Sequence, residues 1–194
     1  MLRPGTATAS LLAASFALAS APAEALGIAS FEVSGSTVAA VIELPGGIGA
    51  DLTVTFDQAL GLSAESLGLS ADLISPSALL GRLPTGVSLP SAFPMLLTVA
   101  PPADGPLSLA GLVSIELHTH NLAFTTSSPL RLFRADGGGA FADVTESMGM
   151  GSYRVRGSTG DFCEFVIVAD TRNLDSVIGT KFTALQAELD DALV

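Results

Sequence analysis

The sequence predicts a mainly β protein, an antiparallel β-sandwich with a C-terminal amphipathic α-helix. Short runs of apolar and β-branched residues alternate with polar residues, and Gly, Pro or Ser bounds each run, as is typical of strands joined by turns. About eight such runs follow one another at close spacing, which favours a sandwich of two sheets. The end of the chain changes to a helical period, which predicts one helix after the strands.

Alternation is clearest in residues 113–120, where apolar residues would face a core and polar residues would face water. The run 51–56 has the same pattern, with threonines on its polar side. Gly-rich segments at 136–139 and 157–160 are expected to be turns between later strands. The predicted strands are 31–33, 37–44, 51–56, 95–99, 113–120, 129–133, 141–144, 152–155 and 162–168.

Two stretches between these strands are less regular. The first contains the doublet Leu-Gly-Leu-Ser-Ala, and we expect a helical turn near 64–67 and an extended run over 69–74. The second, residues 83–115, carries one charge, Asp104, and its prolines would break any membrane-spanning helix. We expect a buried strand at 95–99 with loops on either side, and the alternative is an exposed apolar patch for a partner.

Residues 1–25 have the three parts of a cleavable secretory signal peptide. Arg3 provides a positive start, an uncharged run rich in Ala, Leu and Ser follows, and Ala23-Glu24-Ala25 fits the cleavage rule. Cleavage after Ala25 would leave a mature chain that begins at Leu26. The apolar run is shorter than the ~20 residues of a membrane span. We therefore expect a secreted protein, in the periplasm, at the cell surface or in the medium, and the alternative is a retained anchor.

The mature chain is expected to be one domain, with the sandwich in residues 26–170 and the helix in residues 171–194. An apolar stripe at helical spacing predicts the helix, and it consists of Leu174, Val177, Ile178, Phe182, Leu185, Leu189 and Leu193. Gly179 disfavours a helix interior, so two shorter helical pieces are an alternative. We expect the stripe to pack on the sandwich, because isolated helices of this length are marginal in water. The other interpretation is self-association or a protein partner at this helix.

Charge and cysteine content limit the classes of function. The formal charge is −11, and it stays at −11 in the mature chain because Arg3 and Glu24 leave together. This acidity excludes nucleic-acid binding, since phosphates require clustered Lys and Arg. The single cysteine, Cys163, has no partner for an internal disulfide, and it alternates with Phe165 and Ile167 as a small buried residue would. The fold is therefore expected to rest on packing, and no cofactor is expected.

The only two histidines, His118 and His120, alternate with Glu116 on the clearest predicted strand. Alternate side chains project from one face about 7 Å apart, so these three would point the same way. Two imidazoles and a carboxylate on one face are a candidate metal site. The other interpretation is the polar face of a half-buried strand. No catalytic or cofactor-binding residue is assigned, because the chain has no G-x-S-x-G motif or similar signature.

Arginines are unevenly distributed along the chain. Five of the seven cations of the mature chain lie in its last third, and these are Arg131, Arg134, Arg154, Arg156 and Arg172. Acidic residues share this third, so cross-strand ion pairing is one interpretation, at ~0–1 kcal/mol for each exposed pair. An anion-binding site is the other interpretation.

The same third of the chain resembles a known family. The segments are Pro-Leu-Arg-Leu-Phe at 129–133, Phe-Ala-Asp-Val-Thr at 141–145, Gly-Ser-Tyr-Arg-Val-Arg-Gly at 151–157 and Phe-Cys-Glu-Phe at 162–165. Together they resemble a bacterial family of exported domains of unknown function. The resemblance implies bacterial export and a β-rich fold over most of the mature chain, and it implies no activity and no site residues.

These observations favour an exported, non-catalytic structural or binding module of unknown specificity. The alternative is a metal-assisted hydrolase that uses the strand-borne cluster of Glu116, His118 and His120. The two hypotheses differ in whether the two histidines and the glutamate share a metal ion.

Overall fold

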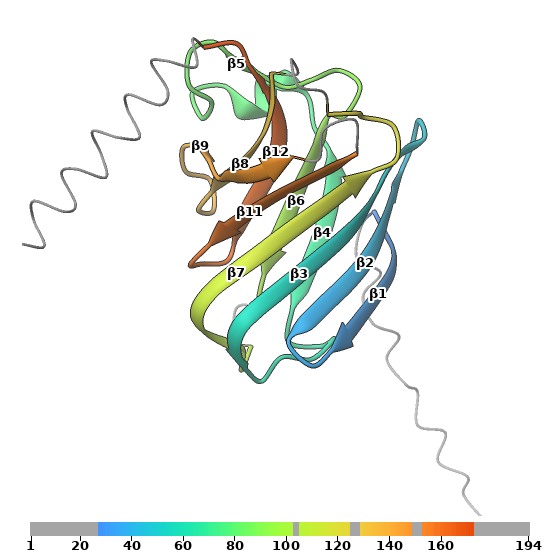
Figure 1. The fold of residues 1–194 in the computed structure, drawn as a ribbon, viewed down its shortest axis with the longest axis vertical. Coiled ribbons are helices and arrows are strands. Elements are labelled where there is room, and N and C mark those ends of the chain that lie inside the picture. Colours follow the sequence, from blue (N-terminus) through green and yellow to red (C-terminus); the bar gives the residue numbers. More distant parts are fainter. Residues whose placement is uncertain (1–26, 103–104, 125–128, 149–152, 173–194) are drawn as a thin grey trace, which may run out of the picture.

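The computed structural model describes residues 27–102, 105–124, 129–148 and 153–172. These residues form two antiparallel sheets that pack face to face (Figure 1). The prediction of a mainly β protein with two antiparallel sheets is therefore confirmed. The expected signal peptide, residues 1–25, lies outside the described residues.

Sheet A contains the two longest described strands, β3 and β7, and has the order β1-β2-β3-β7-β11-β10. Its strands are β1 (Ile28–Ser34), β2 (Thr37–Leu44), β3 (Ile48–Leu60), β7 (Ser108–Thr119), β11 (Arg154–Thr159) and β10 (Thr145–Met148). Sheet B has the order β4-β6-β12-β8-β9, and β5 pairs with β12 beside this path. Its strands are β4 (Gly68–Leu73), β5 (Val87–Ser88), β6 (Met95–Ala100), β8 (Leu130–Ala135), β9 (Ala142–Asp143) and β12 (Cys163–Asp170).

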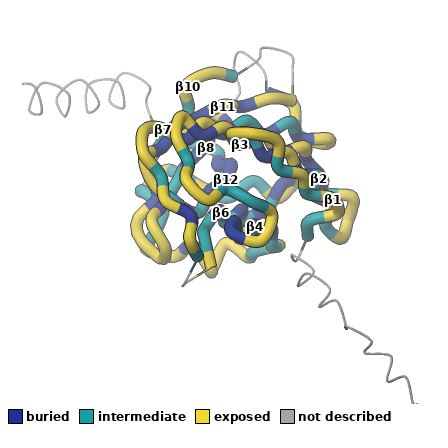
Figure 2. The backbone as a smooth tube through the Cα atoms, turned by 90° about the horizontal axis from the view of Figure 1, so that it is seen from below, coloured by how far each residue is buried: buried dark blue, intermediate teal, exposed yellow. Residues whose placement is uncertain are grey.

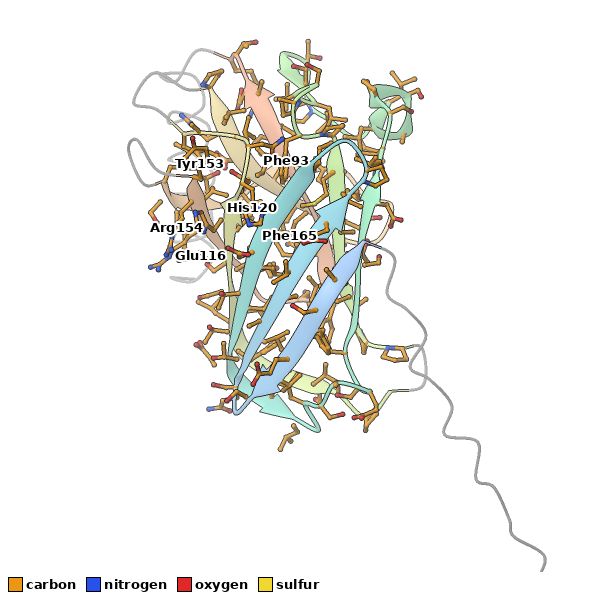
Figure 3. The ribbon with its side chains drawn as sticks, turned by 90° about the vertical axis from the view of Figure 1, so that its right-hand side faces the viewer. Phe93, Glu116, His120, Tyr153, Arg154 and Phe165 are labelled. Atoms are coloured by element: carbon orange, nitrogen blue, oxygen red, sulfur yellow. The ribbon has the colours of Figure 1, made fainter. Side chains whose placement is uncertain are left out.

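Alternation of side chains places one face of each sheet in a common core. In β7, Ile115 and Leu117 are buried, whereas Glu116 and His118 point to the other face. Phe165 of β12 lies in the same core, between the two sheets (Figure 3). Figure 2 shows that the buried stretches of the backbone lie in the interior and the exposed stretches at the periphery. The alternation that predicted the strands is thus the alternation between core and solvent.

The outer face of sheet B is covered by the chain itself. Val166 and Val168 point outward from β12 and are nevertheless buried, so β12 shows no alternation. Residues 74–89, which include the 3-10 turn η1 (Pro76–Leu79), supply most of the apolar side chains that pack over them. None of the large apolar side chains between residues 83 and 102 is exposed. This part of the charge-poor stretch is therefore a covered layer and not the alternative, an exposed patch.

The C-terminal helix of the predicted fold class requires correction. Within the described ranges the only helical structure is η1, and no helix there is long and apolar enough to cross a membrane. Thr171, where the helix was expected to begin, instead extends the pairing of β12 with β5, because its N–H and its hydroxyl donate to the Gly86 carbonyl at 3.0 and 2.8 Å. The rest of the expected helix, residues 173–194, lies outside the described residues. The two inner faces bury each other and residues 74–89 cover sheet B, so the described core is closed without a helix.

A strand that changes sheets joins the two layers at one edge. Asp143 of β9 pairs with Phe133 in sheet B, and Thr145 of β10 pairs with Gly157 in sheet A. A Cβ atom at Gly157 would lie 2.5 Å from the Val144 carbonyl oxygen, which is closer than real contacts allow. Gly157 was expected in a turn, but it lies within β11, where its lack of a side chain lets the crossing strand approach.

Candidate functional site

The outer face of sheet A carries the polar side chains of three neighbouring strands in register. The cross-strand rows are Asp51–His118–Arg154, Thr53–Glu116–Arg156 and Thr55–Ser114–Ser158, taken from β3, β7 and β11. We call these nine residues the polar face. Each of the three strands alternates its polar-face residues with buried ones, so the packing of the core fixes the direction in which they project.

Glu116 lies at the centre of the polar face and holds two arginines. Its side chain is 18% exposed, and its carboxylate accepts hydrogen bonds from Arg154 Nη1 at 3.1 Å and from Arg156 Nε. Hydrogen bonds between ionised groups are stronger than those between neutral groups. The carboxylate therefore orients both guanidinium groups, which are the more exposed members of the cluster.

Asp51 connects the two histidines. Its Oδ2 lies 3.3 Å from His118 Nδ1, and its Oδ1 lies 3.2 Å from His120 Nε2. The two imidazole rings meet edge to face with 6.2 Å between their centroids. Gly49 makes room for the second ring, because a Cβ atom there would lie 2.8 Å from His120 Nδ1. The glycine opposite His120 thus allows both histidines to reach one carboxylate.

The three predicted metal ligands share one face, as expected, but they have separate partners. Glu116 pairs with arginines, whereas His118 and His120 contact Asp51. Across the described part of the chain, no group of three or more His, Cys, Asp or Glu side chains is placed to hold a metal ion. Sequence reasoning missed Asp51. The alternation of the run 51–56 put it on the polar side of its strand, but nothing in the sequence indicated which strand lies opposite.

A shallow hollow lies over the second and third rows of the polar face. Its volume is 350 Å³, and its lining includes Thr55, Ser114, Glu116, Glu146 and Arg156. Glu146 of β10 accepts a hydrogen bond from the Ser158 hydroxyl at the edge of the polar face. The hollow therefore presents hydroxyls, carboxylates and a guanidinium group side by side.

Ion pairing accounts for most of the arginines in the last third of the chain. Two form cross-strand pairs with Glu116, which is the ion-pairing interpretation, and two others, Arg134 and Arg172, pair with acids two residues away, Asp136 and Asp170. These carboxylates partly neutralise the positive charge that an anion site would need. The structure thus favours the ion-pairing interpretation.

Cys163 is free and buried, as the sequence predicted. Its Sγ donates to the Asp161 carbonyl at 3.2 Å, at the end of the sandwich where Arg134 also lies nearby. Burial raises the pKa of the Cys163 thiol above its ordinary value, and this outweighs the opposing effects of Thr159 and Arg134. A reactive cysteine has a lowered pKa and an exposed sulfur, so this residue belongs to the core.

Comparison with known proteins identifies a family. The chain matches the model of a family of unknown function, DUF6689, over residues 7–194. No curated protein and no solved structure shows significant similarity to it. Because the match spans nearly the whole sequence, the chain belongs to the DUF6689 family.

Proposed function

We propose that this chain is an exported, non-catalytic binding module that contacts a protein partner through the polar face of sheet A. The observation that carries the proposal is the exposure of Arg154 and Arg156 side by side on this face, with both guanidinium groups oriented by Glu116. Arg is enriched at protein interfaces and among the residues that dominate binding energy. Groups that are already oriented lose less entropy on binding.

The asymmetry between the two sheets supports the choice of surface. The outer face of sheet B is covered by residues 74–89, whereas the outer face of sheet A presents its nine polar side chains to solvent or to the shallow hollow. Small-molecule sites are mostly concave and apolar. A shallow surface of mixed charge fits the polar surface of another protein better, because each charge can meet a complementary one.

The contacts in the polar face do not favour the alternative, a metal-assisted hydrolase. Glu116 would have to leave both arginines to join the histidines, and Asp51 already occupies the space between His118 and His120. Removing Glu116 would leave two neighbouring cations without their shared carboxylate, which carries an electrostatic cost. The non-catalytic module requires no such rearrangement.

Export and bacterial origin are part of the proposal. The positive start, the apolar run and the Ala-Glu-Ala site of residues 1–25 support secretion, and the resemblance to a bacterial family of exported domains supports the origin. A domain with one cysteine, buried and free, requires no disulfide to fold after export. Mass spectrometry of the protein recovered from a bacterial host should give a mature N-terminus at Leu26.

Site-specific photo-crosslinking in the native host tests the proposed surface. A photoreactive phenylalanine analogue at Thr55, which lines the hollow, should yield one discrete adduct with another protein. The same analogue at Ser77, exposed on η1 on the side of sheet B, is the matched control and should yield no adduct with another protein. Arg156→Ala should reduce the Thr55 adduct at least about tenfold, as expected for an interface residue that contributes more than ~1.4 kcal/mol.

Two outcomes would contradict the proposal. One is the same adducts from Ser77 and Thr55, which would show that crosslinking reports general crowding. The other is a Thr55 adduct that persists at full yield in the Arg156→Ala protein while circular dichroism shows both proteins folded. Either result would remove the polar face as the binding surface.

A further inference from the structure

An apolar groove lies on the layer that covers the outer face of sheet B. It has a volume of 280 Å³, and its lining includes Pro76, Leu79, Leu80, Leu83, Val87 and Leu89. We call this the apolar groove. Leu80, at its edge, is 79% exposed, which is the highest value among the large hydrophobic side chains of the described residues. A single exposed leucine is ordinary, but Leu80 lies beside a concave apolar lining in which a further apolar side chain could be buried.

The described chain ends beside this groove. Thr171 donates two hydrogen bonds to the Gly86 carbonyl, and a Cβ atom at Gly86 would lie 3.0 Å from Arg172 Cγ. Gly86 directly precedes Val87, which lines the groove. Two residues of extended chain span at most about 7 Å. Leu174, the first apolar residue after Arg172, therefore starts within reach of the groove.

The 22 residues that follow Arg172 supply apolar side chains for such a surface. Eight large ones recur along residues 173–194: Leu174, Val177, Ile178, Phe182, Leu185, Leu189, Leu193 and Val194. Transfer of such side chains from water to an apolar surface is favourable. A segment tethered next to its binding surface has an effective concentration in the millimolar range, which favours its own groove over that of a second copy.

We propose that residues 173–194 dock on the apolar groove of the same chain, with the nearest of their apolar side chains entering it. This inference is independent of the proposed function, because the groove lies over sheet B and the polar face lies on sheet A. It concerns only which surface the segment contacts. It also gives a role to Leu80, which would lose its exposure when the segment is docked.

Hydrogen exchange followed by mass spectrometry on the processed, full-length chain tests the docking. The variant Val177→Asp with Phe182→Asp should increase exchange of the amides at residues 79–89 by about tenfold, because their cover is lost. The matched control, Ser176→Asp with Gln186→Asp, adds the same charge at polar positions and should leave these amides unchanged. In the reverse direction, Leu80→Asp should increase exchange in residues 174–189. Leu60→Asp, at the end of β3 and 76% exposed, should not.

The outcome of the same experiment separates the alternatives. Unchanged protection of β7 in every variant shows that the domain remains folded, so any effect on residues 79–89 is local. Equal exchange of residues 79–89 in the wild-type chain and in the Val177→Asp, Phe182→Asp variant would overturn the proposal. A dimer by light scattering that dissociates in this variant would also overturn it, because a second copy would then be the occupant.

Discussion

Asp51 lies directly opposite His118 in the β3–β7 pairing, with its carboxylate Oδ2 3.3 Å from His118 Nδ1. The other carboxylate oxygen contacts His120, so one aspartate joins the only two histidines of the chain. The exposed fractions of the three side chains are 50%, 37% and 44%, and water therefore screens their interaction. This arrangement organises the surface more than it stabilises the fold, and it gives the first prediction.

Replacing Asp51 by Asn should change the free energy of unfolding by no more than about 1 kcal/mol, because exposed charge pairs contribute little. Urea denaturation at neutral pH measures this directly. The matched control is Leu52→Ala on the next residue of β3, where loss of a buried side chain should cost roughly 2–5 kcal/mol. A cost for Asp51→Asn as large as that for Leu52→Ala would show that the histidine contacts are structural.

The protein purified without added metal is expected to carry no stoichiometric transition metal. The reason is that Glu116 is engaged by two arginines and Asp51 by two histidines, so neither carboxylate is available to a metal without breaking these contacts. Elemental analysis before and after EDTA treatment, with thermal melting of both samples, measures this. A metal present at one equivalent and lost in the His118→Ala, His120→Ala double variant would instead support the hydrolase hypothesis.

Gly157→Ala should destabilise the fold by about 1–3 kcal/mol, as overpacking does. The added methyl group would lie 2.5 Å from the carbonyl oxygen of Val144, where the strand crosses between the sheets. Gly160→Ala is the control, because a Cβ atom there meets nothing within 4 Å and Gly160 has no positive φ. Thermal unfolding of the two variants should separate them, and equal melting temperatures would show that the crossing strand adjusts without cost.

Cys163 should react slowly with thiol reagents in the native protein and quickly in urea. Burial raises the pKa of this thiol, and the reactive species is the thiolate. The unfolded pKa is about 8.5. As the pH rises above that value, the unfolded chain loses the thiol proton while the folded protein keeps it, so the free energy of unfolding falls. Ellman's assay in buffer and in 6–8 M urea checks the reactivity, with about tenfold slower labelling expected in the native state. Equal rates in both conditions would contradict the buried position.

Asp170 should stabilise the protein at neutral pH and contribute less in acid. Hydrogen bonds from Arg172 lower the pKa of its carboxyl, and its side chain is 6% exposed. A lowered pKa gives stability that is present above the unfolded value of about 3.9 and is lost as the pH falls below it. Asp170→Asn should cost about 1–3 kcal/mol at pH 7, and the difference from wild type should narrow below pH ~4.

The matched control for Asp170 is Asp136→Asn. Asp136 pairs with Arg134, but its side chain is 72% exposed, so the change should cost less than about 1 kcal/mol. Urea denaturation at pH 7 and pH 3 measures both variants. A difference between wild type and Asp170→Asn that stays constant from pH 7 to pH 3 would show that the ionised carboxyl is not the source of the stability.

Local sequence predicted the strands where alternation was complete. The bounds of β2 are those predicted, Thr37–Leu44, because its inward residues are all apolar and turns bound it on both sides. Prediction was weaker where a strand depends on its partner. The run expected over 51–56 extends to Ile48–Leu60, since pairing with β2 at its start and with β7 at its end gives hydrogen-bond partners to residues whose own pattern does not alternate. The segment 157–160 was assigned to a turn because glycine usually marks one.

What the sequence determined by itself is which side of each strand is apolar, and hence that Glu116, His118 and His120 would share one polar face. What only the tertiary structure decided is which residues contact them. Arginines from β11 contact Glu116, and Asp51 from β3, 69 residues before His120, contacts the two histidines. The period of side chains along a strand is a property of the local backbone, and it can be derived from neighbouring residues. The neighbours across a sheet depend on the order and register of strands that are distant in sequence, and the packing of the whole core sets these.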